Sequence, residues 1–482
     1  MAQARVARFC LNPARGLPQD VEGAGRAGEG TTLRGVKMLM LCLLFGASCF
    51  QIGTALAVIT LDDTMRHQTM KGWEAAVLPT VRDDYLDDLP GFGSLFEQAA
   101  GDLNITRVRI DVFSGTEGRP GWGASYLSGA LTELEMVRGV AYDIINDNDD
   151  PNLADLRGFE FALLDWQMDH LIVPYKREVE RRGGTLFTYL AYIDQNRSKF
   201  RHLNNPAEYA ELMLVLFDHL QARYGFVPDA IDVANEPDYY TATTGTAMGR
   251  VVVATAARLA AAGFHPQFIG PSVVNRSKAV AFFDDMVAVP GAAAHLTELS
   301  YHCYYDSAGD SRAAIGERAA RAGIGTTQNE CWEERNTHVE LHRDLKAGRA
   351  AAWQQGTFKN YYKVDRTTWQ ASLNERTKIK RQYYHYIRPG DVRIDAATTD
   401  QTLDPVAFIR PDGGRVVVVL AMARGTVSIA PLPPGLYEVT YSTSQEFDVH
   451  LPDVEVRGGE AVTVTIPKGG VLTVAAKPGA GA

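Results

Sequence analysis

The stretch AIDVANEP, residues 230–237, decides the fold of this chain because it has the pattern of a short buried strand that ends at an acidic residue. Its apolar positions are followed by the polar pair Asn235-Glu236, and a proline then stops the strand. A second predicted strand, IGTTQNE at 324–330, ends at Glu330 in the same way. Side chains at the carboxyl ends of parallel barrel strands gather at one rim, so we expect the two glutamates to share that rim.

Strand-like and helical patterns alternate along the chain on both sides of these segments. Pro206 stands at a helix start, and Gly263 and Gly323 follow helix ends, as this alternation requires. Eight such units predict an α/β fold, a closed (β/α)8 TIM barrel over residues 72–385. The expected strands are 72–77, 105–112, 185–193, 230–236, 266–271, 296–305, 324–332 and 367–373. The clearest helical patterns are 159–182, 206–224, 248–262, 279–289 and 339–346.

The pattern changes near residue 386, where short alternating strands are separated by turns rich in proline and glycine. This favours an appended antiparallel β-sandwich over residues 386–478. Segment 58–71 precedes the barrel and would add a strand to that sandwich. The clearest sandwich strands are 416–421, 435–441, 461–466 and 471–475.

Residues 1–57 are predicted to be a leader and signal peptide. The apolar stretch 38–45 follows basic residues and continues into small ones, an order that resembles a secretory signal. A membrane anchor is the alternative, but Gly46 and Gln51 interrupt the run before the ~20 apolar residues that a span needs. Lipid attachment at Cys49 is a further option. We expect a secreted or periplasmic protein without stable membrane insertion after signal removal.

The composition, with 46% hydrophobic and 22% charged residues, is that of an ordinary soluble globular chain. The net charge of −10 argues against nucleic acid as a partner. We expect no cofactor and no required metal. The run NDNDDP at 146–151 could bind calcium through its oxygens, but a solvated loop rich in turn-forming residues is the favoured interpretation.

Two carboxylates at one rim are what a double-displacement glycosidase needs, because one donates a proton while the other attacks the sugar. The pKa of the donor must be raised by burial and by its neighbour's charge, whereas the attacking group must stay ionised. The alternative is that Glu236 and Glu330 are surface residues that cap helices.

A barrel with a terminal sandwich and these strand-end residues resembles the clan A retaining glycoside hydrolases, most of all family 30, whose members include glucosylceramidase, xylanase and β-1,6-glucanase types. The likeness covers residues from about 58 to 476 and includes QTMKGWE at 68–74 and YIRPG at 386–390. The resemblance implies that Glu236 is the acid/base and Glu330 the nucleophile. Where the glucosylceramide-cleaving members carry Cys-Asp-Phe-Ser, this chain has DVFSG at 111–115, so the sugar is left open.

The resemblance also suggests substrate-binding residues. It gives Asn235 a hydrogen bond to the sugar 2-hydroxyl, matches His302 and Tyr304 to a His-x-Tyr pair on strand six, and places Trp369 as an aromatic floor under the sugar ring on strand eight. A turn-forming asparagine, a core histidine and a core tryptophan are the alternatives. The hydroxyl of Tyr304 could hold an oxygen of Glu330.

Other candidates come from alternation along the predicted strands. Arg109 and Asp111 lie two residues apart on strand two and must face the mouth or pair with each other. Tyr189 and Tyr192 on strand three and Trp332 after the second glutamate are expected walls of the sugar site.

Two cysteines, Cys303 and Cys331, stand beside proposed site residues. On a strand, neighbours of inward side chains point outward, so both thiols should face the helix layer. Buried free thiols and a bridge between adjacent strands are both open.

The leading hypothesis is a secreted retaining β-glycosidase that acts on a carbohydrate substrate. The alternatives are a catalytically silent carbohydrate-binding barrel, and a transglycosylase of the same fold.

Overall fold

The computed structural model describes residues 57–77, 92–241, 243–332, 335–365, 367–368 and 370–477. The predicted leader therefore lies outside the described residues up to position 56. Among the residues that are described, no helix has both the length and the apolar character needed to cross a membrane.

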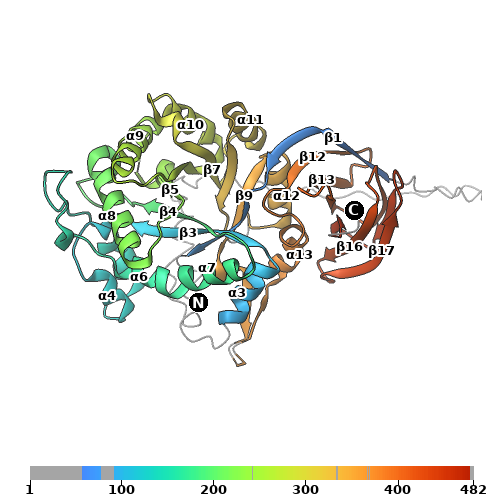
Figure 1. Ribbon diagram of the computed structural model, residues 1–482, viewed down its shortest axis with the longest axis horizontal. Coiled ribbons are helices and arrows are strands. Elements are labelled where there is room, and N and C mark those ends of the chain that lie inside the picture. Colours follow the sequence, from blue (N-terminus) through green and yellow to red (C-terminus); the bar gives the residue numbers. More distant parts are fainter. Residues whose placement is uncertain are drawn as a thin grey trace, which may run out of the picture. The chain divides into compact units, whose positions relative to one another are not determined.

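The central element is a closed barrel of eight parallel strands in sequence order, built from the described residues (Figure 1). Hydrogen bonds between its first strand and its last close the ring. The predicted α/β barrel class is confirmed. The strands are β2 Gly72–Val77, β3 Ile105–Phe113, β4 Phe187–Ile193, β5 Ala230–Asp232, β6 Gln267–Asn275, β7 Leu296–Tyr305, β8 Gly325–Glu330 and β9 Ala350–Thr357.

Helices cover the outside of the barrel (Figure 1). The longest, α8, begins with Pro206, whose fixed φ suits a first helical position, and is followed by Gly225 in the left-handed conformation at φ 77°. The helices are α3 Phe92–Gly101, α4 Trp122–Leu127, α5 Glu133–Arg138, α6 Ala162–Gln167, α7 Val173–Arg181, α8 Pro206–Tyr224, α9 Gly245–Ala261, α10 Ala279–Val287, α11 Arg312–Ala322, α12 His338–Lys346 and α13 Glu375–Tyr384.

The predicted eighth strand, 367–373, is wrong. The barrel closes instead with β9, whose sequence AAAWQQGT is buried throughout, while Gln370–Leu373 (β11) pairs with Tyr362–Asp365 (β10) in a separate ribbon. Three alanines give a strand little intrinsic preference, and this run directly follows a helical pattern. The predicted segment has more strand-forming residues, but among its described residues only Gln370–Leu373 form a strand, and that strand belongs to the ribbon.

The C-terminal strands and one strand from before the barrel form a nine-stranded sheet with its own hydrophobic core. The early strand, β1 Ala57–Thr69, pairs with β12 in antiparallel and with β15 in parallel orientation. Helix α13 joins barrel to sheet, since Gln382 bonds to both Thr440 and Ser442. The remaining strands are β12 Val392–Thr398, β13 Leu403–Ile409, β14 Arg415–Ala421, β15 Gly425–Ala430, β16 Gly435–Thr443, β17 Val449–Val456, β18 Val462–Ile466 and β19 Gly470–Ala476.

Candidate active site

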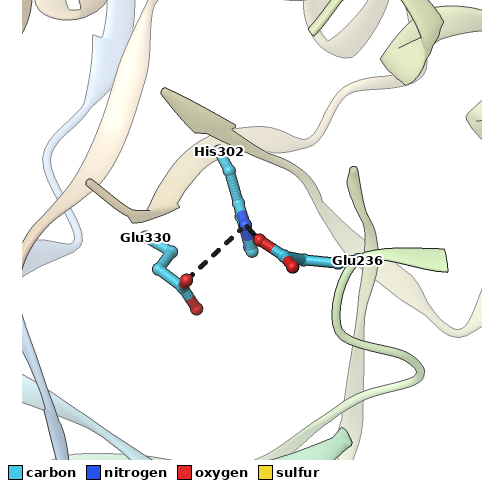
Figure 2. A group of neighbouring side chains, drawn as sticks. All are labelled: Glu236, His302 and Glu330. Carbon is cyan, nitrogen blue, oxygen red and sulfur yellow. Dashed lines mark hydrogen bonds and ion pairs between the residues drawn. The ribbon is translucent and has the colours of Figure 1, made fainter. Parts of the chain in front are cut away.

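Glu236 and Glu330 face each other across the carboxyl-end rim of the barrel, with His302 between them (Figure 2). Glu236 follows β5, and Glu330 is the last residue of β8. The His302 Nδ1 atom lies 3.1 Å from Glu236 Oε1 and 4.0 Å from Glu330 Oε1. One oxygen of each glutamate and one ring nitrogen all lie within 4.8 Å of one another. Glu236 is 4% exposed and Glu330 is 7% exposed, so both carboxyl groups lie in a largely dry environment.

The backbone at Glu236 is strained. Its φ of 53° is uncommon for a residue with a side chain, and a residue before proline normally stays extended. The neighbouring strands hold it there: Glu236 N donates to Ser272 O at 3.0 Å and Asn235 N donates to Tyr192 O at 2.8 Å. Such strain collects where a fold must aim one side chain, and here it aims Glu236 at Glu330.

Glu330 is held as an anion. Arg109 Nη1 donates to its Oε2 at 2.5 Å, and the Tyr304 hydroxyl donates to its Oε1 at 2.9 Å. Burial alone would raise the pKa of Glu330, but the charges of Arg109 and His302 and these hydrogen bonds outweigh it and leave the pKa below its ordinary value.

The pKa of Glu236 is shifted in the opposite direction, above its ordinary value. Burial raises its pKa, the contact with His302 lowers it, and the negative charge of Glu330 raises it again, with a net increase. For His302, burial lowers the pKa and the charges of both glutamates raise it, again with a net increase. The environment therefore favours a proton on Glu236 and none on Glu330, the division that an acid and a nucleophile require.

Arg109 and Asp111, both on β3, act together. Arg109 Nε donates to Asp111 Oδ1 at 2.7 Å, and both residues are 1% exposed. Burial raises the pKa of Asp111 to about 6, against the charge of Arg109. Asp111 thus orients the guanidinium that contacts Glu330, so the two predicted possibilities, facing the mouth and pairing, both occur.

Two further candidates present unused polar atoms. Asn235 is 7% exposed, and its Oδ1 accepts no hydrogen bond from any described residue. Trp332 is half-buried, and its indole N–H likewise has no acceptor in the described part of the chain. A Cβ at Gly356 on β9 would come within 3.1 Å of the indole, so that glycine leaves the ring its space. Both atoms could bind a polar ligand.

Tyr192 does not line the site. Its side chain is fully buried in the layer outside the barrel, packed edge-on against Tyr209, and its hydroxyl bonds to His202 Nδ1 at 2.9 Å. Tyr189, three residues earlier, points into the barrel and donates to Glu74, so Tyr192 must point out. Trp369 lies outside the described residues.

The sequence analysis did not predict the buried polar cluster that lies beneath the rim. Asp232 Oδ2 accepts from Ser272 Oγ at 2.8 Å and from Asn329 Nδ2 at 3.0 Å. Burial raises the pKa of Asp232 to about 7. Asp232 is the last residue of β5, and the alternation of polar residues along β5, β6 and β8 is the sequence signal for this cluster.

A disulfide joins Cys303 and Cys331, with their Cα atoms 5.1 Å apart. It resolves the two open possibilities in favour of a bridge. Cys303 lies between His302 and Tyr304, and Cys331 follows Glu330, so the bridge ties the strand that carries the histidine to the end of the strand that carries the anion.

The group Glu236, His302 and Glu330 is the one cluster of metal-binding residue types within the described ranges whose ligand atoms come this close. A cationic guanidinium already contacts Glu330, and the Tyr304 hydroxyl contacts its other oxygen. That arrangement suits an ionised carboxylate facing a neutral organic ligand better than it suits a second cation.

Residues 390–474 match the family model described as the glycosyl hydrolase family 30 beta sandwich domain. Over most of the chain the structure is similar to the catalytic domain of GH30 xylanase C from Talaromyces cellulolyticus, with a TM-score of 0.65, 14% identity, and coverage of 87% of this chain and 100% of that one. The chain has the fold of the family 30 glycoside hydrolases.

Other solved structures are similar to this chain in fold. A conserved exported protein from Bacteroides fragilis gives a TM-score of 0.62 at 13% identity, covering 87% of this chain and 100% of that chain. A glucosidase from Croceicoccus marinus gives 0.54 at 13% identity, covering 87% and 98%. No curated protein sequence matches the chain.

Proposed function

We propose that this protein is a retaining glycosidase that cleaves β-linked glycans or glycosides by double displacement. The observation that carries the proposal is the facing pair Glu236 and Glu330, whose surroundings favour opposite protonation states. An oxygen of one lies within 4.8 Å of an oxygen of the other. Retaining enzymes place their carboxyl groups about 5–5.5 Å apart and inverting enzymes about 6.5–9.5 Å, so this close approach supports retention.

In the first step, a Glu330 oxygen forms a bond to the anomeric carbon while the bond from that carbon to the leaving oxygen breaks. Glu236 gives its proton to the leaving oxygen. Arg109 and Tyr304 keep Glu330 ionised before the attack and fix the direction of its oxygens. The free Oδ1 of Asn235 could accept a hydrogen bond from the sugar 2-hydroxyl.

In the second step, water replaces the glycosyl–Glu330 bond. Once Glu330 is esterified, the negative charge that raised the pKa of Glu236 is gone, so Glu236 becomes a stronger acid and rests as a carboxylate. It then takes the proton from the attacking water, and Glu330 leaves as an anion. One glutamate thus serves as acid and then as base.

Export is part of the proposal. The apolar stretch 38–45 has the pattern of a secretory signal. A disulfide between Cys303 and Cys331 fits an oxidising compartment. One protein of the same fold is described as a conserved exported protein.

The test is a screen of the purified protein against nitrophenyl β-glycosides, xylan and β-1,6-glucan, with the anomer of the first product read by proton NMR. We expect the β-anomer first, and an α-anomer would refute the proposal. Glu330→Gln should remove turnover, and Glu236→Ala should lose about 10²–10⁴-fold and recover partly with azide. The control is Glu455→Gln, an exposed acid of the sheet domain. Sugar binding without hydrolysis would identify a silent binding protein, and transfer to added acceptor sugars would identify a transglycosylase.

A further inference from the structure

The segment that carries Glu236 runs past the end of its strand, beyond the regular hydrogen bonds of the barrel. The pairing of β5 with β6 covers Ala230 to Asp232 and stops before Glu236 is reached. Glu236 has a φ of 53°, an uncommon conformation that persists only where the surrounding structure enforces it. Other bonds must therefore fix this segment on both sides of Glu236.

Two backbone hydrogen bonds hold the segment up to Glu236. Asn235 N donates to Tyr192 O, and Glu236 N donates to Ser272 O on β6 at 3.0 Å. Ser272 is itself in the left-handed region at φ 51°, and its hydroxyl donates to Asp232 Oδ2 at 2.8 Å. The carbonyl that receives the Glu236 amide is therefore held in place from β5.

Beyond Glu236, the carboxylate of Asp238 connects the segment to β6. Its Oδ1 accepts from Val274 N at 2.8 Å, and its Oδ2 accepts from Asn275 N at 3.2 Å. These are the last two residues of β6, where the pairing of that strand with β7 becomes irregular. The side chain of Asp238 is 3% exposed, and its Oδ2 lies 3.4 Å from Lys278 Nζ. One side chain thus binds two amides of the neighbouring strand and a cation, and it fixes the turn that follows Glu236.

We propose that Asp238 is a positioning residue for Glu236, which holds the strained turn 236–238 against β6 and so fixes the direction of the Glu236 carboxyl group. The inference rests on the proposed function, in which Glu236 is the acid/base. Hydrogen bonds from amides to an ionised carboxylate are about twice as strong as those between neutral groups. A displacement of a catalytic group by about 1 Å can cost 10²-fold in rate. Asp238 therefore affects the proton transfer through Glu236 and not through the sugar.

The leaving group of the substrate separates a positioning role from a purely structural one. A dinitrophenolate leaves as a stable anion and needs little help from an acid, whereas a phenolate is a stronger base and needs the proton. A displaced Glu236 should therefore slow the cleavage of a phenyl β-glycoside far more than that of a dinitrophenyl β-glycoside. A loss of folded protein would slow both to the same extent.

The experiment compares kcat/KM of the purified full chain on phenyl and 2,4-dinitrophenyl β-glycosides of the sugar that the nitrophenyl screen identifies. We expect Asp238→Ala to lose about 10–100-fold on the phenyl glycoside and less than about 3-fold on the dinitrophenyl glycoside. Asp238→Asn keeps one acceptor oxygen for the β6 amides, so it should show the same selectivity at a smaller size, and it provides the comparison where Asp238→Ala does not fold.

The matched control is Asp229→Ala. Asp229 directly precedes β5 at the opposite end of the barrel, and it also binds a backbone amide of a neighbouring strand, since its Oδ2 accepts from Thr188 N at 2.7 Å. Its removal should leave the ratio of the two kcat/KM values as in the wild type. Equal losses on both glycosides in the Asp238 variants, no loss on either, or an equal change of the ratio in the control would overturn the positioning role while the proposed function stands. A wild type that cleaves neither glycoside would instead overturn the proposed function, and this inference with it.

Discussion

Replacing Tyr304 by phenylalanine removes one hydroxyl and keeps the ring, so it tests how the structure keeps Glu330 ionised. The lost hydrogen bond is the 2.9 Å contact to Glu330 Oε1. A hydrogen bond to a charged group contributes about 1.5–3 kcal/mol, and 1.36 kcal/mol equals one pKa unit, so the pKa of Glu330 should rise by about 1–2 units. The sign follows because the hydroxyl stabilises the ionised form, and its loss favours the protonated one.

The assay is the pH dependence of kcat/KM on a nitrophenyl β-glycoside that the screen identifies. Since attack needs ionised Glu330, the acidic limb of the profile should move to higher pH by about 1–2 units. The value of kcat/KM on the plateau, where Glu330 is ionised and Glu236 is still protonated, should change far less. Tyr305→Phe is the matched control, because Tyr305 is the next residue and 54% exposed. An unmoved acidic limb, or an equal movement in the control, would refute the assigned role of Tyr304.

Two further predictions concern stability. The double variant Cys303→Ala/Cys331→Ala removes a bridge with a sequence separation of 28 residues, so the free energy of unfolding in urea should fall by about 3–4 kcal/mol; an unchanged value would contradict the bridge. Burial raises the pKa of Asp232 to about 7, so the wild type should lose up to about 4 kcal/mol as pH rises from about 4 through 7. The Asp232→Asn variant has no carboxyl group at this position, so its free energy of unfolding should depend less on pH between about 4 and 7. A pH dependence as steep as that of the wild type would contradict the raised pKa of Asp232.

The sequence was sufficient for the barrel and for the facing glutamates, because both depend on local patterns. Glu236 and Glu330 each end a strand, and parallel topology brings such ends to one rim. His302 and Tyr304 were placed on one face by their spacing of two, and both contact the glutamates. The alternation also placed Cys303 on the opposite face, where it forms its bridge.

The predictions that the structure contradicts needed information that a local sequence pattern does not contain. In β4 almost every residue is buried, so the alternation does not show which side chains face the barrel interior. The prediction that Tyr192 lines the mouth is therefore wrong, because its side chain points outward. In β9 the alanines resemble a helix, and the strand exists because the barrel needs an eighth member between β8 and β2. The contact between Asn146 and Glu208 joins segments far apart in the sequence, which no motif predicts.

The polar interior of the barrel explains how the rim can hold two carboxyl groups in unequal states. Deep inside, Arg107 bonds to Glu74 at 3.1 Å and to Glu298 at 2.9 Å, which joins β3 to β2 and, across the barrel, to β7. Above this tier, Asn329 bonds to Asp232 and joins β8 to β5. Apolar side chains of similar volume would stabilise a barrel at least as well, but they leave strands free to shift by fractions of an ångström. Directional bonds between strands fix the rim from below, and we interpret them as the reason that the 2.5 Å contact between Arg109 on β3 and Glu330 at the end of β8 can be kept.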